Sequence, residues 1–92
     1  MPAFKLTKMQ AEIVLAMWFD EDLVLDLTQD QFPWIYCVRK LGRAGGTFYP
    51  STPVVGLMKH DFLVKDKVLP RWHLNHHVAR IWTAQTSQEK SE

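Results

Sequence analysis

The sequence predicts a single α+β domain with two to three helices and small antiparallel β-hairpins. Its 92 residues suffice for one compact domain but not for two. Hydrophobic residues make up 47% of the chain and aromatic residues 12%, which is enough for a core and excludes global disorder. Segments with helical periodicity alternate with segments in which every second residue is apolar. We therefore expect one domain over residues 1–84 and a disordered, polar tail over residues 85–92.

The first predicted helix begins after Thr7. Thr7 and Gln10 have the spacing of a capping box, in which each side chain binds a backbone amide of the first turn. Nearly all residues from 13 to 19 are apolar, so more than one face of the helix is apolar. The helix is therefore either central to the core or covered by a partner on its second side. The acidic residues 20–22 oppose the helix dipole and should end it.

Three β-segments should follow this helix. Residues 23–27 have leucine at every second position, which is the period of a half-buried strand. The polar residues 28–33 should form a turn, and the aromatic and β-branched residues 34–39 favour a second strand. Residues 42–46 are glycine-rich and predict a flexible loop tip, from which residues 47–49 return as a short third strand.

A second helix is predicted over residues 51–60. It starts with two hydroxyl residues followed by Pro53, and proline is favoured there because the amide it lacks would be unpaired in the first turn. Gly56 costs this helix about 1 kcal/mol relative to alanine. The helix should end near Asp61, where glycine is the more usual residue.

A hairpin and a last helix complete the predicted fold. Residues 62–65 and 69–74 should pair around a short turn. Pro70 must then lie at an edge or a bulge, because proline has no amide to donate to a ladder. Asn75 should cap a helix that runs from residue 76 to about residue 83.

The order and spacing of these elements resemble those of small winged-helix proteins. Leu6, Thr7 and Gln10 match the opening of the first helix in that family, and Leu74 with Asn75 resembles the passage from the wing to the last helix. The apolar positions of the recognition helix and the strand after it are matched by Val54, Leu57, Met58, Phe62 and Leu63.

The resemblance implies that residues 51–60 form a recognition helix and that the following hairpin forms the wing. Two features depart from the family pattern. A β-like segment replaces the usual scaffold helix before the recognition helix. The outward positions of the recognition helix include Val55 and Gly56, which can offer a base only apolar contact.

Nucleic-acid binding is the first functional hypothesis, as a DNA-binding transcription regulator of bacterial or phage type that recognises double-stranded DNA. The net charge is only +1, but residues 1–34 carry two lysines against six acids, whereas residues 35–92 carry nine basic residues against four acids. Such a basic half could meet phosphates, or it could be an ordinary solvated surface. The candidate contacts are Arg39, Lys40, Arg43, Thr52, Lys59, His60, Lys65, Lys67 and Arg71, with Arg80 as a further basic residue.

Protein binding is the alternative hypothesis. The chain is similar in size and aromatic richness to phage-encoded inhibitors such as anti-CRISPR proteins, with which it shares no motif. A domain this small can hardly bury four tryptophans completely, so at least one aromatic residue should belong to an interface. The apolar first helix also predicts a homodimer. The candidate interface residues are Val14, Trp18, Phe48, Tyr49 and Val55.

Catalysis is not expected from this sequence. It contains no paired carboxylates, no Ser-His-Asp arrangement and no phosphate-binding glycine loop, and Cys37 falls in an apolar strand, where a thiol is usually inert. His73, His76 and His77 fit no zinc spacing, so we expect neither a metal nor another cofactor. With no signal peptide pattern, no membrane-spanning run and one cysteine, a cytoplasmic location is expected.

Overall fold

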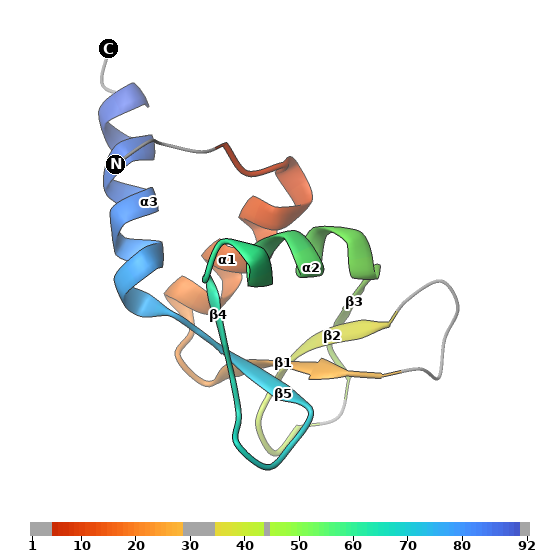
Figure 1. Ribbon diagram of the computed structural model, residues 1–92. Helices are drawn as coiled ribbons and strands as arrows, with labels where there is room; N and C mark the ends of the chain where they lie inside the picture. Colours follow the sequence, from red (N-terminus) through yellow and green to blue (C-terminus); the bar gives the residue numbers. More distant parts are fainter. Residues whose placement is uncertain (1–4, 29–34, 44, 91–92) are drawn as a thin grey trace.

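The computed structural model describes residues 5–28, 35–43 and 45–90, without the side chains of residues 86–90. Within these residues the chain forms three helices and five strands, which confirms the predicted α+β class. Figure 1 shows α1 and α2 over one face of the sheet, with α3 leading away from the end of β5. In chain order the elements are α1 (Lys8–Phe19), β1 (Leu23–Leu27), β2 (Tyr36–Lys40), β3 (Thr47–Tyr49), α2 (Ser51–Lys59), β4 (Leu63–Lys65), β5 (Arg71–Leu74) and α3 (His76–Lys90).

The strands form one antiparallel sheet in the order β3-β2-β1-β5-β4. We call the face under the helices the inner face and the opposite face the outer face. In β1, residues Leu23, Leu25 and Leu27 pack against the core, so the alternating Val24 and Asp26 lie on the outer face. This alternation confirms the half-buried strand that the leucines predict.

Helix α1 lies at the centre of the core, which was one of the two alternatives for its apolar surface. It contacts α2, α3, β1 and β5, and Ile13, Val14 and Met17 are buried. The expected partner contact through Val14 is therefore wrong, because this side chain is buried within its own chain, whereas Leu15 and Phe19 of the same helix are exposed. The prediction that Tyr49 contacts a partner is also wrong, since Tyr49 pairs with Tyr36 in the sheet register and is buried in the same core.

The capping box at the start of α1 is present. The Thr7 side chain accepts a hydrogen bond from the Gln10 amide (3.2 Å), and the Thr7 amide donates to Gln10 Oε1 (3.0 Å). Gln10 Nε2 also donates to the Pro53 carbonyl (3.1 Å), which joins α1 to α2. A Cβ at Gly56 would overlap this amide group. The glycine that weakens α2 thus leaves room for the bond between the helices.

Replacing Gln10 by glutamate should separate the two roles of this side chain. Glutamate still accepts from the Thr7 amide but cannot donate to the Pro53 carbonyl, so we expect the free energy of unfolding to fall by about 1 kcal/mol. Gln10→Ala loses the cap as well and should cost about 2 kcal/mol. Urea unfolding measures both values. Wild-type stability in Gln10→Glu would show that the bond to Pro53 contributes nothing.

The end of α2 uses an aspartate in place of the usual glycine. Asp61 adopts φ +63°, a left-handed conformation that aspartate tolerates better than most residues. Its carbonyl accepts a hydrogen bond from Asn75 Nδ2 (2.9 Å). Asn75 Oδ1 in turn accepts from the Val78 amide (3.4 Å), as predicted for the cap of the last helix. Asp61 precedes β4 and Asn75 follows β5, so the hydrogen bond between them closes the open end of the β4–β5 hairpin.

Several element boundaries differ from the predicted ones. Strand β2 begins at Tyr36, and Trp34 of the predicted strand lies outside the described residues, as does most of the predicted turn 28–33. Pro70 lies just before β5, where its carbonyl accepts a hydrogen bond from the Leu27 amide (3.0 Å) and its missing amide is not needed. Helix α3 continues to Lys90, beyond the predicted end near residue 83, because the chain there lacks glycine and proline.

The connectivity is compatible with a winged-helix-like fold. Strand β5 lies between β1 and β4, and α2 immediately precedes the β4–β5 hairpin. Between β1 and α2 the chain forms β2 and β3, so a hairpin stands where the winged-helix pattern has a scaffold helix. This agrees with the β-like segment expected from the sequence at that place.

Candidate functional site

The basic residues proposed for DNA binding do not share one face. Lys65 pairs with Trp72 in the sheet register, so both lie on the inner side. Arg71 pairs with Asp26 and therefore lies on the outer face. Arg39, also on the outer face, binds Asp26 through Nε, and Arg71 Nε binds the other oxygen of the same carboxylate at 2.8 Å. Arg39 and Arg71 therefore do not lie on the face of the sheet that carries Lys65.

The other predicted nucleic-acid contacts are distributed over several elements. Lys40 lies 3.6 Å from Asp20 and 4.0 Å from Asp22, so its charge is paired at the surface. Thr52 is exposed near the start of α2. The remaining exposed candidates are Arg43 before β3, Lys59 and His60 at the end of α2, Lys67 in the hairpin turn and Arg80 on α3.

The end of the hairpin is a hydrogen-bonded turn that carries apolar side chains. We call residues 66–70 the hairpin tip. Asp66 Oδ2 accepts hydrogen bonds from the amides of Val68 and Leu69, both at 2.9 Å, and the Asp66 amide donates to the Arg71 carbonyl (2.8 Å). Within this turn Val68 is 86% exposed and Leu69 is 44% exposed. Backbone hydrogen bonds thus hold two adjacent aliphatic side chains in water at the end of the hairpin.

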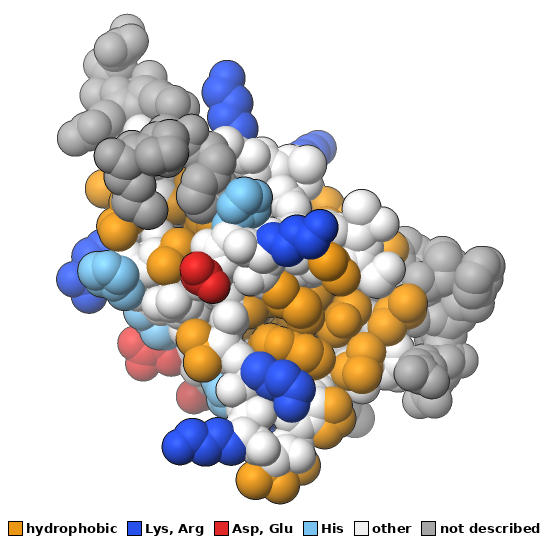
Figure 2. Space-filling view, in the orientation of Figure 1, with side chains coloured by type: hydrophobic (Ala, Val, Ile, Leu, Met, Phe, Trp, Pro, Cys, Tyr) orange, Lys and Arg blue, Asp and Glu red, His pale blue; other side chains and the backbone are white. Residues whose placement is uncertain are grey.

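Two lysine side chains lie at or next to the hairpin tip. Lys65 Nζ lies 5.9 Å from the centroid of the Trp72 ring, a cation–π distance, and Trp72 meets Tyr36 edge to face at 5.6 Å. Lys67 is exposed within the tip. Figure 2 shows hydrophobic side chains gathered below α2 and again at the lower end of the molecule, with Lys and Arg side chains beside both areas.

The two backbone bonds to Asp66 lower the pKa of its carboxyl group, with smaller contributions from His73 and Arg71. A carboxyl whose pKa is lower in the folded state stabilises the fold above its unfolded pKa and loses that effect as the pH falls through the folded pKa. We therefore expect the Val68 and Leu69 amide resonances to titrate together below pH 3.8, the ordinary value for aspartate. In Asp66→Asn the same resonances should not titrate over this range. An inflection above 3.8 in the wild type would contradict the prediction.

The structure also places the remaining interface candidates. Trp18 is half-buried, with its ring 5.8 Å from that of His76. Phe48 is half-buried on the outer face, next to Cys37. Val55 is exposed on α2. Val68 and Leu69 were not predicted as interface residues, although two aliphatic residues in a turn between charged residues could have indicated an exposed apolar contact.

Cys37 is buried and free, as expected, but it lies on the outer face and outside the main core. Burial raises the pKa of its thiol, the Asp26 carboxylate raises it further, and Arg39 opposes this. A Cβ at Gly46 would lie 2.8 Å from Cys37 Sγ and 2.5 Å from the Val38 carbonyl oxygen. The glycine is therefore required for the chain to pass over Cys37.

Gly46→Ala should consequently lower the free energy of unfolding by about 2 kcal/mol, from the backbone conformation at φ +152° and the overlap with β2. Gly45→Ala is the matched control, because Gly45 also has a positive φ but no atom within 4 Å of its added Cβ. Thermal unfolding of both variants measures the difference. Equal losses would mean that the close approach to Cys37 costs nothing.

Two kinds of site are not found in the described part of the chain. No group of three or more His, Cys, Asp or Glu residues there is arranged to hold a metal ion. Among the helices described, none combines the length and the apolar character needed to cross a membrane.

Comparison with protein-family models, curated proteins and solved structures found no match to this chain.

Proposed function

We propose that this domain is a non-catalytic protein-binding module that contacts its partner through the hairpin tip. The observation that carries the proposal is the pair of exposed aliphatic side chains, Val68 and Leu69, on a turn fixed by Asp66. A turn already ordered before binding loses little conformational entropy in a complex. Apolar side chains that leave water on association supply the main favourable term.

The charges near the tip indicate the chemistry of the partner. Lys65 and Lys67 are exposed, whereas Asp66 is occupied by the turn. A partner with an apolar pocket bordered by carboxylates would complement this arrangement and would associate faster at low salt. The same lysines also fit the DNA hypothesis, but Val68 and Leu69, which are exposed beside Lys67, have no group that hydrogen-bonds a phosphate.

Two measurements test the proposal. A photo-crosslinking amino acid at position 68 should give one cross-linked protein in the native cell extract, whose purified form then binds the wild-type domain in solution. The same amino acid at position 84, exposed on α3, serves as the control and should not give this product. Duplex DNA of random sequence should show no saturable binding at about 50 mM salt. Tight DNA binding that falls steeply with salt would overturn the proposal.

A further inference from the structure

The outer face of the sheet carries a hollow that the proposed contact does not use. The helices lie on the inner face (Figure 1), and the hollow has a volume of about 260 Å³. This is slightly below the range of about 300–1,000 Å³ for drug-sized ligands, so its occupant must be small. It is lined by Asp26, Leu27, Thr28, Cys37, Arg39, Gly45 and Phe48.

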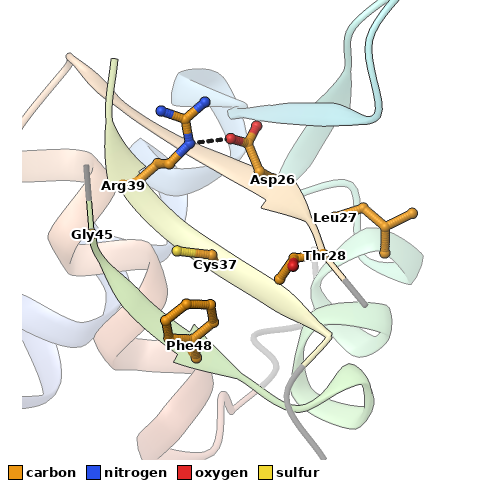
Figure 3. Close-up of a pocket in the computed structure, with 7 residues that line it drawn as sticks. All are labelled: Asp26, Leu27, Thr28, Cys37, Arg39, Gly45 and Phe48. Atoms are coloured by element: carbon orange, nitrogen blue, oxygen red, sulfur yellow. Dashed lines mark hydrogen bonds and ion pairs between the residues drawn. The ribbon is translucent and has the colours of Figure 1, made fainter. Parts of the chain in front are cut away.

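Figure 3 shows an aromatic end and a cationic end in this hollow. The Phe48 ring lies at one end, Arg39 at the other and Cys37 between them, while Leu27 is turned away. Arg39 is two residues from Cys37 along β2, and Phe48 is opposite Cys37 on the neighbouring strand. Strand geometry therefore separates the origins of the Arg39 and Phe48 side chains by about 8 Å.

Asp26 holds two guanidinium groups at the cationic end. Arg39 Nε donates to Asp26 Oδ2 and Arg71 Nε donates to Oδ1. One carboxylate between two arginines leaves a net charge of about +1. The side chains of Arg39 and Arg71 are 28% and 21% exposed, and Figure 3 shows the terminal nitrogens of Arg39 on the side away from Cys37 and Phe48. The terminal N–H groups of a guanidinium bound through Nε can donate to a phosphate or carboxylate oxygen.

Cys37, Gly45 and Phe48 make the remaining surface of the hollow suitable for an aromatic group. The Cys37 thiol is neutral at pH 7 because burial raises its pKa, so it does not repel an anion. Gly45 also lines the hollow, and a Cβ added there would meet no atom within 4 Å. The exposed part of Phe48 can stack with a planar ring, as aromatic side chains do with nucleic-acid bases.

We propose that the outer face binds a nucleotide, with the phosphate on Arg39 and the base against Phe48. The sugar between the phosphate and the base would then lie over Cys37, which is between the two side chains. The ligand is either a free mononucleotide or one unit of a single strand, since both present the same groups. This site is independent of the hairpin tip, because the arginines and Lys65 lie on opposite faces.

The test compares three probes, adenosine 5′-monophosphate, adenosine and inorganic phosphate, by following the amide resonances of Gly45 and Phe48. The monophosphate should bind at least about tenfold more tightly than either part alone, because it makes both contacts. Adenine oligonucleotides of increasing length distinguish the two sources. Affinity that rises with length indicates a single strand, and constant affinity indicates a mononucleotide. Equal affinity for the monophosphate and inorganic phosphate would overturn the proposal.

Variants assign the two ends of the site. Arg39→Gln should reduce the affinity for the monophosphate to that for adenosine, and Phe48→Leu should reduce it to that for inorganic phosphate. Arg80→Gln and Phe19→Leu are the matched controls at exposed positions outside the hollow and should bind as the wild type does. If Arg39→Gln does not fold, Phe48→Leu and the comparison of probes decide the matter. Unchanged binding in a folded Arg39→Gln or in Phe48→Leu would refute the assignment.

Discussion

Replacing Phe62 by alanine is expected to lower the free energy of unfolding by about 3–5 kcal/mol. Phe62 has no exposed surface and is the largest of the fully buried side chains among the described residues. Its ring meets Trp82 edge to face, with centroids 6.3 Å apart, so it joins the start of the hairpin to α3. Its amide donates to the Leu57 carbonyl (3.0 Å), which ties the same residue to α2. Truncation would leave a cavity where three elements meet.

Phe19→Ala is the matched control for this experiment. Phe19 is the last residue of α1 and is 79% exposed, so the same chemical change should alter stability by less than about 0.5 kcal/mol. Chemical unfolding of the two variants gives the difference directly. A loss below about 1 kcal/mol in Phe62→Ala would mean that the core does not close around this ring.

The parts of the fold that the sequence predicts best are those determined by neighbouring residues. Thr7 and Gln10 are three residues apart, and their mutual bonds need only one turn of helix. The leucines of β1 alternate because a strand between a core and an open face requires it. Asn75 likewise caps α3 through an amide three residues away. Each of these signals is complete within a short segment.

The parts that could not be predicted depend on contacts between distant segments. Whether Val14 meets a partner or the core depends on α2 and α3, which the chain reaches only later. The sequence does not indicate that three charged residues from different strands meet. The register of β1 with β2 and β5 places Arg39, Arg71 and Asp26 side by side. The basic C-terminal half therefore does not form one phosphate-binding face, although its composition is consistent with one.

Position 68 should separate the competing functions. Val68→Asp should weaken the complex with the cross-linked partner by about 2 kcal/mol or more, because a carboxylate would have to leave water at the centre of an apolar contact. Val68 is 86% exposed and its amide still binds Asp66, so the free energy of unfolding should not change. Calorimetric titration of both forms measures the difference.

Val55→Asp provides the matched comparison on α2, since Val55 is also an exposed valine and belongs to the helix that would read DNA. If the hairpin tip is the contact, Val55→Asp should bind as the wild type does, and a larger effect there would move the interface to α2.

Replacing both Lys65 and Lys67 by alanine should chiefly slow association and reduce its dependence on salt. In a duplex binder the ranking reverses. The lysine variant would then lose affinity for all sequences, with a salt slope lower by about 1 for each lost phosphate contact, while Val68→Asp would cost less than the lysines.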